Sequence, residues 1–191
     1  MNNLTTYQVN ALRTEAPMST AYDRLDHAGL GFITETGEIA TQVKRIAIYG
    51  KSLDSLDGAL TLRQHIAEEV GDVMWYLAIA SDTCGLNIFH VLDVVPAGLS
   101  LKEVTKALAN LNGKFLRLLA EAEHGHLDLY FGNTLREMWK SCQAIACLVG
   151  VPIDEIAGAN IAKLQARFPG KFSTEAAEAR ADKGGLDARN S

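Results

Sequence analysis

Long apolar runs are missing from this chain, and so are most signs of export. No stretch reaches the ~18–20 apolar residues that a bilayer-spanning helix needs. The first residues, 1–5, have neither the basic region nor the apolar region of a signal peptide. Three cysteines occur, Cys84, Cys142 and Cys147, with no CxxC spacing, and they predict buried, reduced thiols. We therefore expect a cytoplasmic protein without a membrane partner.

Positive charge is also scarce. The net charge is −5 and the pI about 5.5, which does not favour a nucleic-acid surface. Alternating strand patterns of useful length are absent as well. The chain has 191 residues, of which 48% are hydrophobic, and this is enough for one domain with its own core. The sequence therefore predicts an all-α helical bundle that does not bind nucleic acid.

Helical periodicity accounts for most of the chain between clear breaks. The expected helices span residues 4–16, 22–49, 61–83, 100–123, 133–149 and 152–168, with one or two further turns in 86–95. Ser19 or Thr20 is the expected N-cap of the second helix. Thr61 with Gln64, and Ser100 with Glu103, have the spacing of capping boxes, and Asn133 is the expected cap of the fifth helix. Residues 50–60 and 124–132 are expected loops.

The domain prediction follows from these breaks. We expect a single domain over residues 1–172 and a flexible tail over 173–191. A shift of 65 residues aligns Gly85 with Gly150 and Met74 with Trp139. Segment 93–149 is thus either an inserted helical hairpin or a degenerate second repeat.

Acidic residues lie beside the apolar stripe of the third helix. At about 100° per residue, Glu69 and Asp72 fall on one side of this helix and flank its buried face. Glu35 and Glu38 have the same place on the second helix. Four carboxylates brought together this way repel one another unless a cation neutralises them. Because Mg²⁺ prefers carboxylate oxygens, the pattern indicates a Mg²⁺ site.

The same stretches resemble a known enzyme family. Residues 31–40 (GFITETGEIA) and 68–77 (EEVGDVMWYL) resemble the MazG-like all-α nucleoside triphosphate pyrophosphohydrolases. Residues 159–169 (ANIAKLQARFP) look like the closing motif of that family, and Tyr7-Gln8 before Arg13-Thr14 is similar to its opening. The resemblance covers about residues 4–92 and 150–172. Segment 93–149 departs from it and leaves the oligomeric state and the substrate pocket open.

The resemblance implies both an activity and a set of ligands. Members of the family cleave nucleoside triphosphates, (d)NTPs, between the α- and β-phosphates, and they release the monophosphate and pyrophosphate with Mg²⁺; Mn²⁺ is expected to substitute. Carried onto this chain, the metal ligands are Glu35, Glu38, Glu69 and Asp72. A carboxylate that the metal does not use fully could accept the proton of the attacking water, and Glu38 and Glu68 are the candidates.

A basic band predicts the phosphate contacts. Asn160, Lys163 and Arg167 share one side of the last helix, where the two cations could hold phosphates and Asn160 could bind sugar or base. Arg45 shares the side of the acids on its own helix and is either a phosphate ligand or half of a surface ion pair. Tyr76 could stack on the base.

Several other functions stay open from the sequence. Within the superfamily, dUTPase-like and phosphoribosyl-ATP pyrophosphohydrolase activities are alternatives. Glu121-x-x-His124 and Glu123-x-x-His126 match the ExxH motif of di-iron bundles, but they overlap on one helix end. A catalytically silent helical interaction protein is the alternative outside enzymes. Because a bundle this small rarely encloses a nucleotide, we expect a homodimer or homotetramer.

Overall fold

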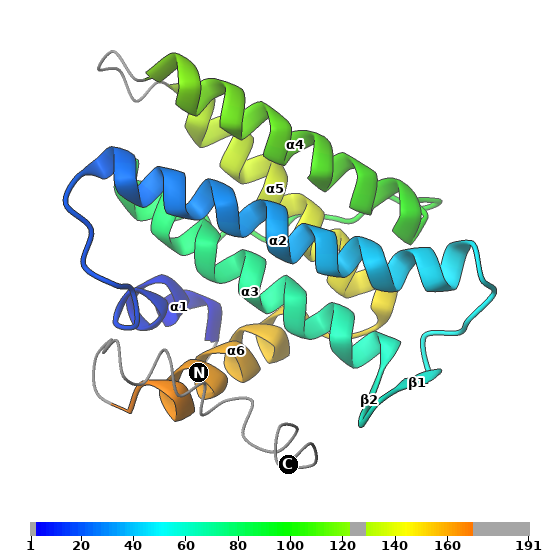
Figure 1. Cartoon of the computed structure of the whole chain (residues 1–191). Coiled ribbons are helices and arrows are strands. Elements are labelled where there is room, and N and C mark those ends of the chain that lie inside the picture. Colours follow the sequence, from blue (N-terminus) through cyan, green and yellow to red (C-terminus); the bar gives the residue numbers. More distant parts are fainter. Residues whose placement is uncertain (1–2, 123–128, 170–191) are drawn as a thin grey trace, which may run out of the picture.

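The protein is a helical bundle with one very short hairpin. The computed structural model describes residues 3–122 and 129–169 (Figure 1). Within them the elements follow the order α1 (Asn3–Leu12), α2 (Ala21–Ala47), β1 (Leu56–Asp57), β2 (Leu60–Thr61), α3 (Leu62–Thr83), α4 (Leu101–Ala122), α5 (Leu129–Val149) and α6 (Ile153–Arg167). The prediction of an all-α fold is confirmed.

Local sequence signals set most helix ends. Thr20 caps α2 and forms a capping box with Asp23, and Thr61 does the same for α3 with Gln64. Ser100 and Glu103 exchange the same pair of hydrogen bonds before α4. Gly150 follows α5 with φ of 72°, a conformation that residues with a side chain rarely adopt. These predicted caps and stops are confirmed.

Other local predictions were wrong. Residues 86–95 form no helix, because they run along α5, where Trp139 donates to the Val91 carbonyl at 2.8 Å and Gln143 Oε1 accepts from the Asp93 amide at 2.9 Å. Asn133 lies inside α5, which begins at Leu129, so it is not a cap. The expected loop 50–60 contains β1 and the start of β2, paired antiparallel with Leu56 opposite Thr61. The expected tail, 173–191, lies outside the described residues.

The cysteine prediction held only in part. All three cysteines are free, and Cys142 is fully buried as expected. Cys84 is half-buried, whereas Cys147 is exposed on the last turn of α5. The prediction that all three thiols are buried is therefore wrong for Cys147.

The helices form three layers around a continuous core. The pair α2–α3 lies in the middle, α4 and α5 cover one side of it, and α1 and α6 cover the other (Figure 1). Large side chains such as Phe32, Leu77, Phe115 and Trp139 are almost entirely buried between these layers. Asn112 of α4 donates to the Phe32 carbonyl and to Thr36 Oγ1 of α2, each at 2.8 Å, and this fixes the upper two layers together.

Segment 93–149 supplies one complete layer. Its two helices pack on each other and on α2 and α3. An inserted hairpin and a degenerate repeat both predict such a pair, so both interpretations stay open. In the part of the chain that the structure describes, no single helix is long and apolar enough to cross a membrane. Phe131–Val149 and Ile153–Arg167 pass that test only as a pair, bent by 103°.

Candidate metal centre and its surroundings

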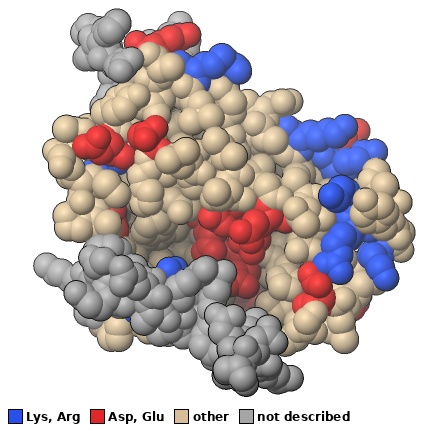
Figure 2. Space-filling model, viewed as in Figure 1, with Lys and Arg blue, Asp and Glu red and all other residues tan. Residues whose placement is uncertain are grey.

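Three of the four predicted metal ligands converge. Glu35 of α2 and Glu69 and Asp72 of α3 each offer a carboxylate oxygen, and these atoms all lie within 4.8 Å of one another. Figure 2 shows acidic side chains gathered in a hollow at the place where α3 faces α6 in Figure 1. Glu38 is exposed and lies outside this group of three, although its charge acts on both Glu35 and Glu69. We call Glu35, Glu69 and Asp72 the acid cluster.

The electrostatics of the acid cluster favour a neutralising partner. Burial, followed by the charges of Asp72, Glu38 and Glu35, raises the pKa of Glu69 from 4.5 to about 9. Burial and neighbouring carboxylates also raise the pKa of Glu35. For Asp72, burial raises the pKa even though Lys163 opposes the shift. A cation bound among these oxygens would therefore relieve a large repulsion.

Lys163 of α6 already supplies one positive charge to the acid cluster. Its Nζ lies 2.6 and 2.7 Å from the two carboxylate oxygens of Asp72 and 3.3 Å from Glu68 Oε1. Burial alone would lower the pKa of Lys163, but Asp72 and Glu68 outweigh it, so the pKa is raised and the side chain stays charged. Lys163, predicted as a phosphate ligand, is therefore paired with Asp72 and Glu68 of α3.

Asn160 connects the acid cluster to the core. Its Nδ2 donates to Asp72 Oδ1 at 2.9 Å, and its Oδ1 accepts from the Tyr7 hydroxyl at 2.8 Å. A Cβ atom on Gly71 would lie 3.0 Å from the Asn160 Cβ. The glycine in the middle of α3 therefore permits the close approach of α6 that places Asn160 beside Asp72.

Tyr76 lies near enough to the acid cluster for Glu35 and Asp72 to act on its pKa. Its ring makes edge contacts with His27, Phe32 and Trp75, at centroid distances of 5.4, 6.3 and 4.9 Å. A Cβ on Gly31 would lie 2.2 Å from this ring, so only glycine fits there. Burial, Glu35 and Asp72 raise the pKa of Tyr76 to about 12, which keeps the phenol neutral. Tyr76 is therefore half-buried beside the acids, where its sequence position predicted it.

The two arginines differ in their surroundings. Arg45 forms an ion pair with Asp57 of the hairpin and donates to Gln42 at 3.2 Å, so it has the surface partner that the sequence left as an alternative. Arg167 lies near enough to Tyr76 for its charge to oppose the rise of that pKa, and its guanidinium stacks on Phe168 at 5.5 Å. Of the two, Arg167 is the one whose charge acts on Tyr76.

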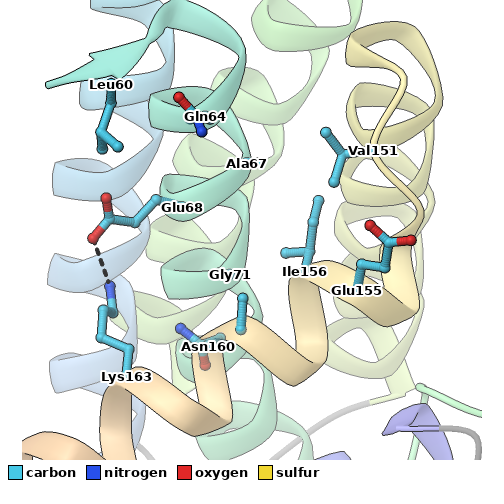
Figure 3. A pocket seen from close by; sticks show the side chains of 11 residues that line it. Leu60, Gln64, Ala67, Glu68, Gly71, Val151, Glu155, Ile156, Asn160 and Lys163 are labelled. Carbon is cyan, nitrogen blue, oxygen red and sulfur yellow. Dashed lines mark hydrogen bonds and ion pairs between the residues drawn. The ribbon is translucent and has the colours of Figure 1, made fainter.

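A cleft of about 450 Å³ opens next to these residues. Its walls come from α3, α6 and the residues that precede each helix, and apolar side chains such as Leu60, Ala67, Val151 and Ile156 line most of it. Glu68, Asn160 and Lys163 form its polar end (Figure 3). Figure 3 also shows the Gln64 amide with its nitrogen turned down toward the cleft. The cleft and the acid cluster therefore share a border.

Sequence reasoning missed three residues that shape this site. Tyr7, Gly31 and Gly71 were named only within motifs, and none of them was given a place in the site. A glycine in a helix interior costs about 1 kcal/mol relative to alanine, so both glycines carried a usable signal of close approach. The contact partner of Tyr7 is 153 residues away, and no local pattern indicates it.

Comparison with known proteins does not assign an activity to this site. No known protein family and no solved structure matches the chain. A relative is the "Gene 37 protein" of Mycobacterium phage L5, which is 41% identical over 56 residues. The match covers 28% of this chain and 44% of that protein, so the chain spans less than half of that relative. Its printed name describes no activity.

Proposed function

We propose that this protein is a Mg²⁺-dependent nucleoside triphosphate pyrophosphohydrolase that converts a (d)NTP and water to the (d)NMP and pyrophosphate. The observation that carries the proposal is the convergence of Glu35, Glu69 and Asp72 directly beside Lys163 and Asn160. A cation site bordered by a fixed ammonium is the arrangement that a polyphosphate chain requires.

The acid cluster fits a hard divalent cation. All three donors are carboxylates from two neighbouring helices, and Mg²⁺ typically binds one or two carboxylates together with water and substrate phosphate. Burial first, and the neighbouring carboxylates second, raise the pKa of Glu69 to about 9, and a bound cation would oppose both effects. When bound, Mg²⁺ would neutralise the phosphates and acidify a water molecule. We expect Mn²⁺ to substitute for it.

The remaining residues have distinct tasks in this proposal. Lys163 would bind a phosphate oxygen while keeping Asp72 in place, and Arg167 would bind a second phosphate in bidentate fashion. Glu38 and Glu68 border the acid cluster without belonging to it. Either could accept the proton of the attacking water, because neither needs both of its oxygens for the cation.

We place the nucleoside of the substrate in the cleft beside Glu68. A cleft of about 450 Å³ with apolar walls and a polar end suits a base and sugar. The polar end of the cleft holds Asn160 and Lys163, which also contact Asp72. A substrate could therefore bind with its nucleoside in the cleft and its phosphates at the acid cluster.

A substrate panel tests the proposed function. Purified protein is incubated with single (d)NTPs, dUTP among them, and phosphoribosyl-ATP, with Mg²⁺ or Mn²⁺ and with EDTA. We expect pyrophosphate release from at least one substrate, and loss of release with EDTA and in Asp72→Asn. Orthophosphate as the primary product would indicate cleavage at another bond.

The substrate panel and an iron analysis of the purified protein separate the remaining alternatives. No turnover of any substrate with either metal would favour a silent interaction protein. Iron in the purified protein would favour the di-iron alternative, of whose ExxH residues only Glu121 lies within the described part of the chain.

A further inference from the structure

A buried hydrogen-bond chain runs from α1 to the acid cluster. The Tyr7 hydroxyl donates to Asn160 Oδ1 at 2.8 Å, and Asn160 Nδ2 donates to Asp72 Oδ1 at 2.9 Å. These three residues come from α1, α6 and α3. The chain therefore ties a metal-ligand candidate to two helices outside its own.

The chemistry of the groups fixes the direction of this chain. An ionised carboxylate only accepts hydrogen bonds, so the Asn160 amide must present its NH₂ end to Asp72. The amide oxygen then faces Tyr7, and only a donor can satisfy it. A reversed amide would place its oxygen against the Asp72 carboxylate. The Asp72 carboxylate thus sets the orientation of Asn160, and the Tyr7 hydroxyl, which also lies 3.2 Å from the Gly71 carbonyl oxygen, holds the amide there by donating to its oxygen.

The surroundings hold the chain in a dry place. Tyr7 is completely buried, and Asn160 is 4% exposed. The Tyr7 ring packs on Phe89 at 5.0 Å, and Gly71 leaves the space that Asn160 occupies. Hydrogen bonds away from water are stronger and more costly to leave incomplete. Burial, followed by the charge of Asp72, raises the pKa of Tyr7 well above its usual value, so the hydroxyl keeps its proton.

We propose that Tyr7 is a positioning residue of the metal centre, which orients the Asp72 carboxylate toward the cation through Asn160. Lys163 contacts both oxygens of Asp72 and pulls the carboxylate toward α6. Asn160, one turn earlier on α6, donates to Oδ1 at 2.9 Å and limits the rotation of the carboxylate. Without the Tyr7 hydroxyl, the amide loses the donor that holds its oxygen in place. This inference rests on the metal site of the proposed function.

The test compares two buried hydroxyls at the same end of the molecule. Tyr7→Phe removes the hydroxyl that contacts Asn160. Thr14→Val removes a buried hydroxyl that accepts from Trp75 and does not contact the acid cluster. Mn²⁺ affinity is measured by calorimetry without substrate. We expect about a tenfold loss in Tyr7→Phe, the lower end of the range for outer partners of metal ligands, and wild-type affinity in Thr14→Val. Equal affinities in the two variants would overturn the proposal.

A double-mutant cycle tests the route through Asn160. Asn160→Ala should weaken Mn²⁺ binding, and Tyr7→Phe should add nothing to that loss, because the two act in series. Additive losses would overturn the relay. If Tyr7→Phe fails to fold, Asn160→Ala carries the test, and unchanged affinity in that variant would also overturn it.

The outcome is distinct from that of the proposed function. Weak Mn²⁺ binding by Tyr7→Phe in a protein that hydrolyses no triphosphate would support the relay and reject the enzyme. Normal Mn²⁺ binding by Tyr7→Phe in an active enzyme would reject the relay and support the enzyme. A wild-type protein that binds no Mn²⁺ would reject both.

Discussion

Glu69 is the residue whose ionisation the fold resists most among the three acids of the cluster. Its carboxylate is one of three from α2 and α3 within 4.8 Å, and half-burial removes the water that would screen them. The resulting pKa of about 9 means that the metal-free folded protein holds a proton there at neutral pH. The stability of the protein should therefore depend on pH in a definite direction.

We predict that metal-free protein loses stability as pH rises from about 4.5 to about 9. In this range the folded state binds more protons than the unfolded state, because the pKa of Glu69 rises from 4.5 to about 9 on folding, so the free energy of unfolding falls with pH. The raised pKa values of Glu35 and Asp72 act in the same direction. Glu69→Gln should flatten this slope and melt at least as high as wild type at alkaline pH. Urea denaturation in EDTA at several pH values between about 4.5 and 9 measures the free energy of unfolding. An unchanged slope in Glu69→Gln would show that Glu69 is not the group that makes stability depend on pH.

Glu69→Gln and Asp72→Asn should also remove most hydrolytic activity while helical content is preserved. Each substitution deletes one anionic ligand without changing the shape of the side chain, so circular dichroism should match the wild type while pyrophosphate release falls by about 10²-fold or more, the scale of a removed electrostatic stabiliser. Collapse of either variant would mean that the acids are structural.

Gly31 is predicted to set the position of Tyr76. In Gly31→Ala the new Cβ would lie 2.2 Å from the tyrosine ring, so the ring must move, and overpacking of this kind costs about 1–3 kcal/mol. We expect lower thermal stability and weaker substrate binding. Gly37→Ala is the matched control on the same helix, because its Cβ would meet nothing, and it should raise stability by about 0.5–1 kcal/mol. Similar melting of the two variants would contradict the role of Gly31.

At the scale of elements, α6 makes the site. It crosses α3 at Gly71 and brings Asn160 and Lys163 to an acidic helix that begins 91 residues before Ile153. The same crossing forms one wall of the cleft, with Ile156 and Ala159 facing α3. The placement of α6 therefore decides both the charge balance of the acid cluster and the shape of the cleft.

Filling the cleft should separate nucleoside binding from metal binding. Ala159→Trp adds a large side chain to an exposed position on the cleft wall. We predict a KM increase of about tenfold, equivalent to about 1.4 kcal/mol of lost binding, with unchanged Mn²⁺ affinity. Gln165→Trp, on an exposed part of the same helix outside the cleft lining, is the control and should keep the wild-type KM. An unaltered KM in Ala159→Trp would place the nucleoside elsewhere.

At the scale of the whole molecule, segment 93–149 and the site lie on opposite sides of the α2–α3 layer. Among the described residues, neither the acid cluster nor the cleft includes a residue of α4 or α5. These helices instead hold α2 in register, through contacts such as Asn112 with Thr36. The pair α4–α5 therefore supports α2 and α3 on the side away from the cleft, and α6 forms one wall of the cleft.

We keep the homodimer or homotetramer as a proposal for the assembled protein. α2 exposes Leu30 at 57% and Ile33 at 46%, apolar side chains on the same helix as Glu35. Light scattering of the purified protein decides the point, and a monomeric mass at micromolar concentration would contradict it.

Metal binding should raise the stability of the whole domain. A ligand that binds only the folded state adds about 2.7 kcal/mol at a hundredfold excess over its Kd. For a domain of this size we predict that Mg²⁺ or Mn²⁺ raises Tm by about 5–10 °C. Asp72→Asn should lose most of this shift. Differential scanning calorimetry measures the Tm shift. Equal shifts in the wild type and in Asp72→Asn would place the cation outside the acid cluster.

The sequence by itself determined the helices and the acidic face. Capping residues such as Thr20 and Thr61 act on backbone groups within three residues, and helical periodicity alone puts Glu69 beside Asp72. Such local rules do not depend on the rest of the fold. They fail where long-range packing decides, as at residues 86–95, which pack along α5 without forming a helix.

Only the tertiary structure decided which charges and donors meet. The Lys163–Asp72 pair spans 91 residues and the Tyr7–Asn160 bond spans 153, and both depend on how α6 crosses α3. The tertiary structure likewise pairs Arg45 with Asp57, and it leaves Glu38 outside the three converging carboxylates. Helix periodicity fixes the direction of a side chain around its own axis, whereas the packing of several helices fixes what lies in that direction.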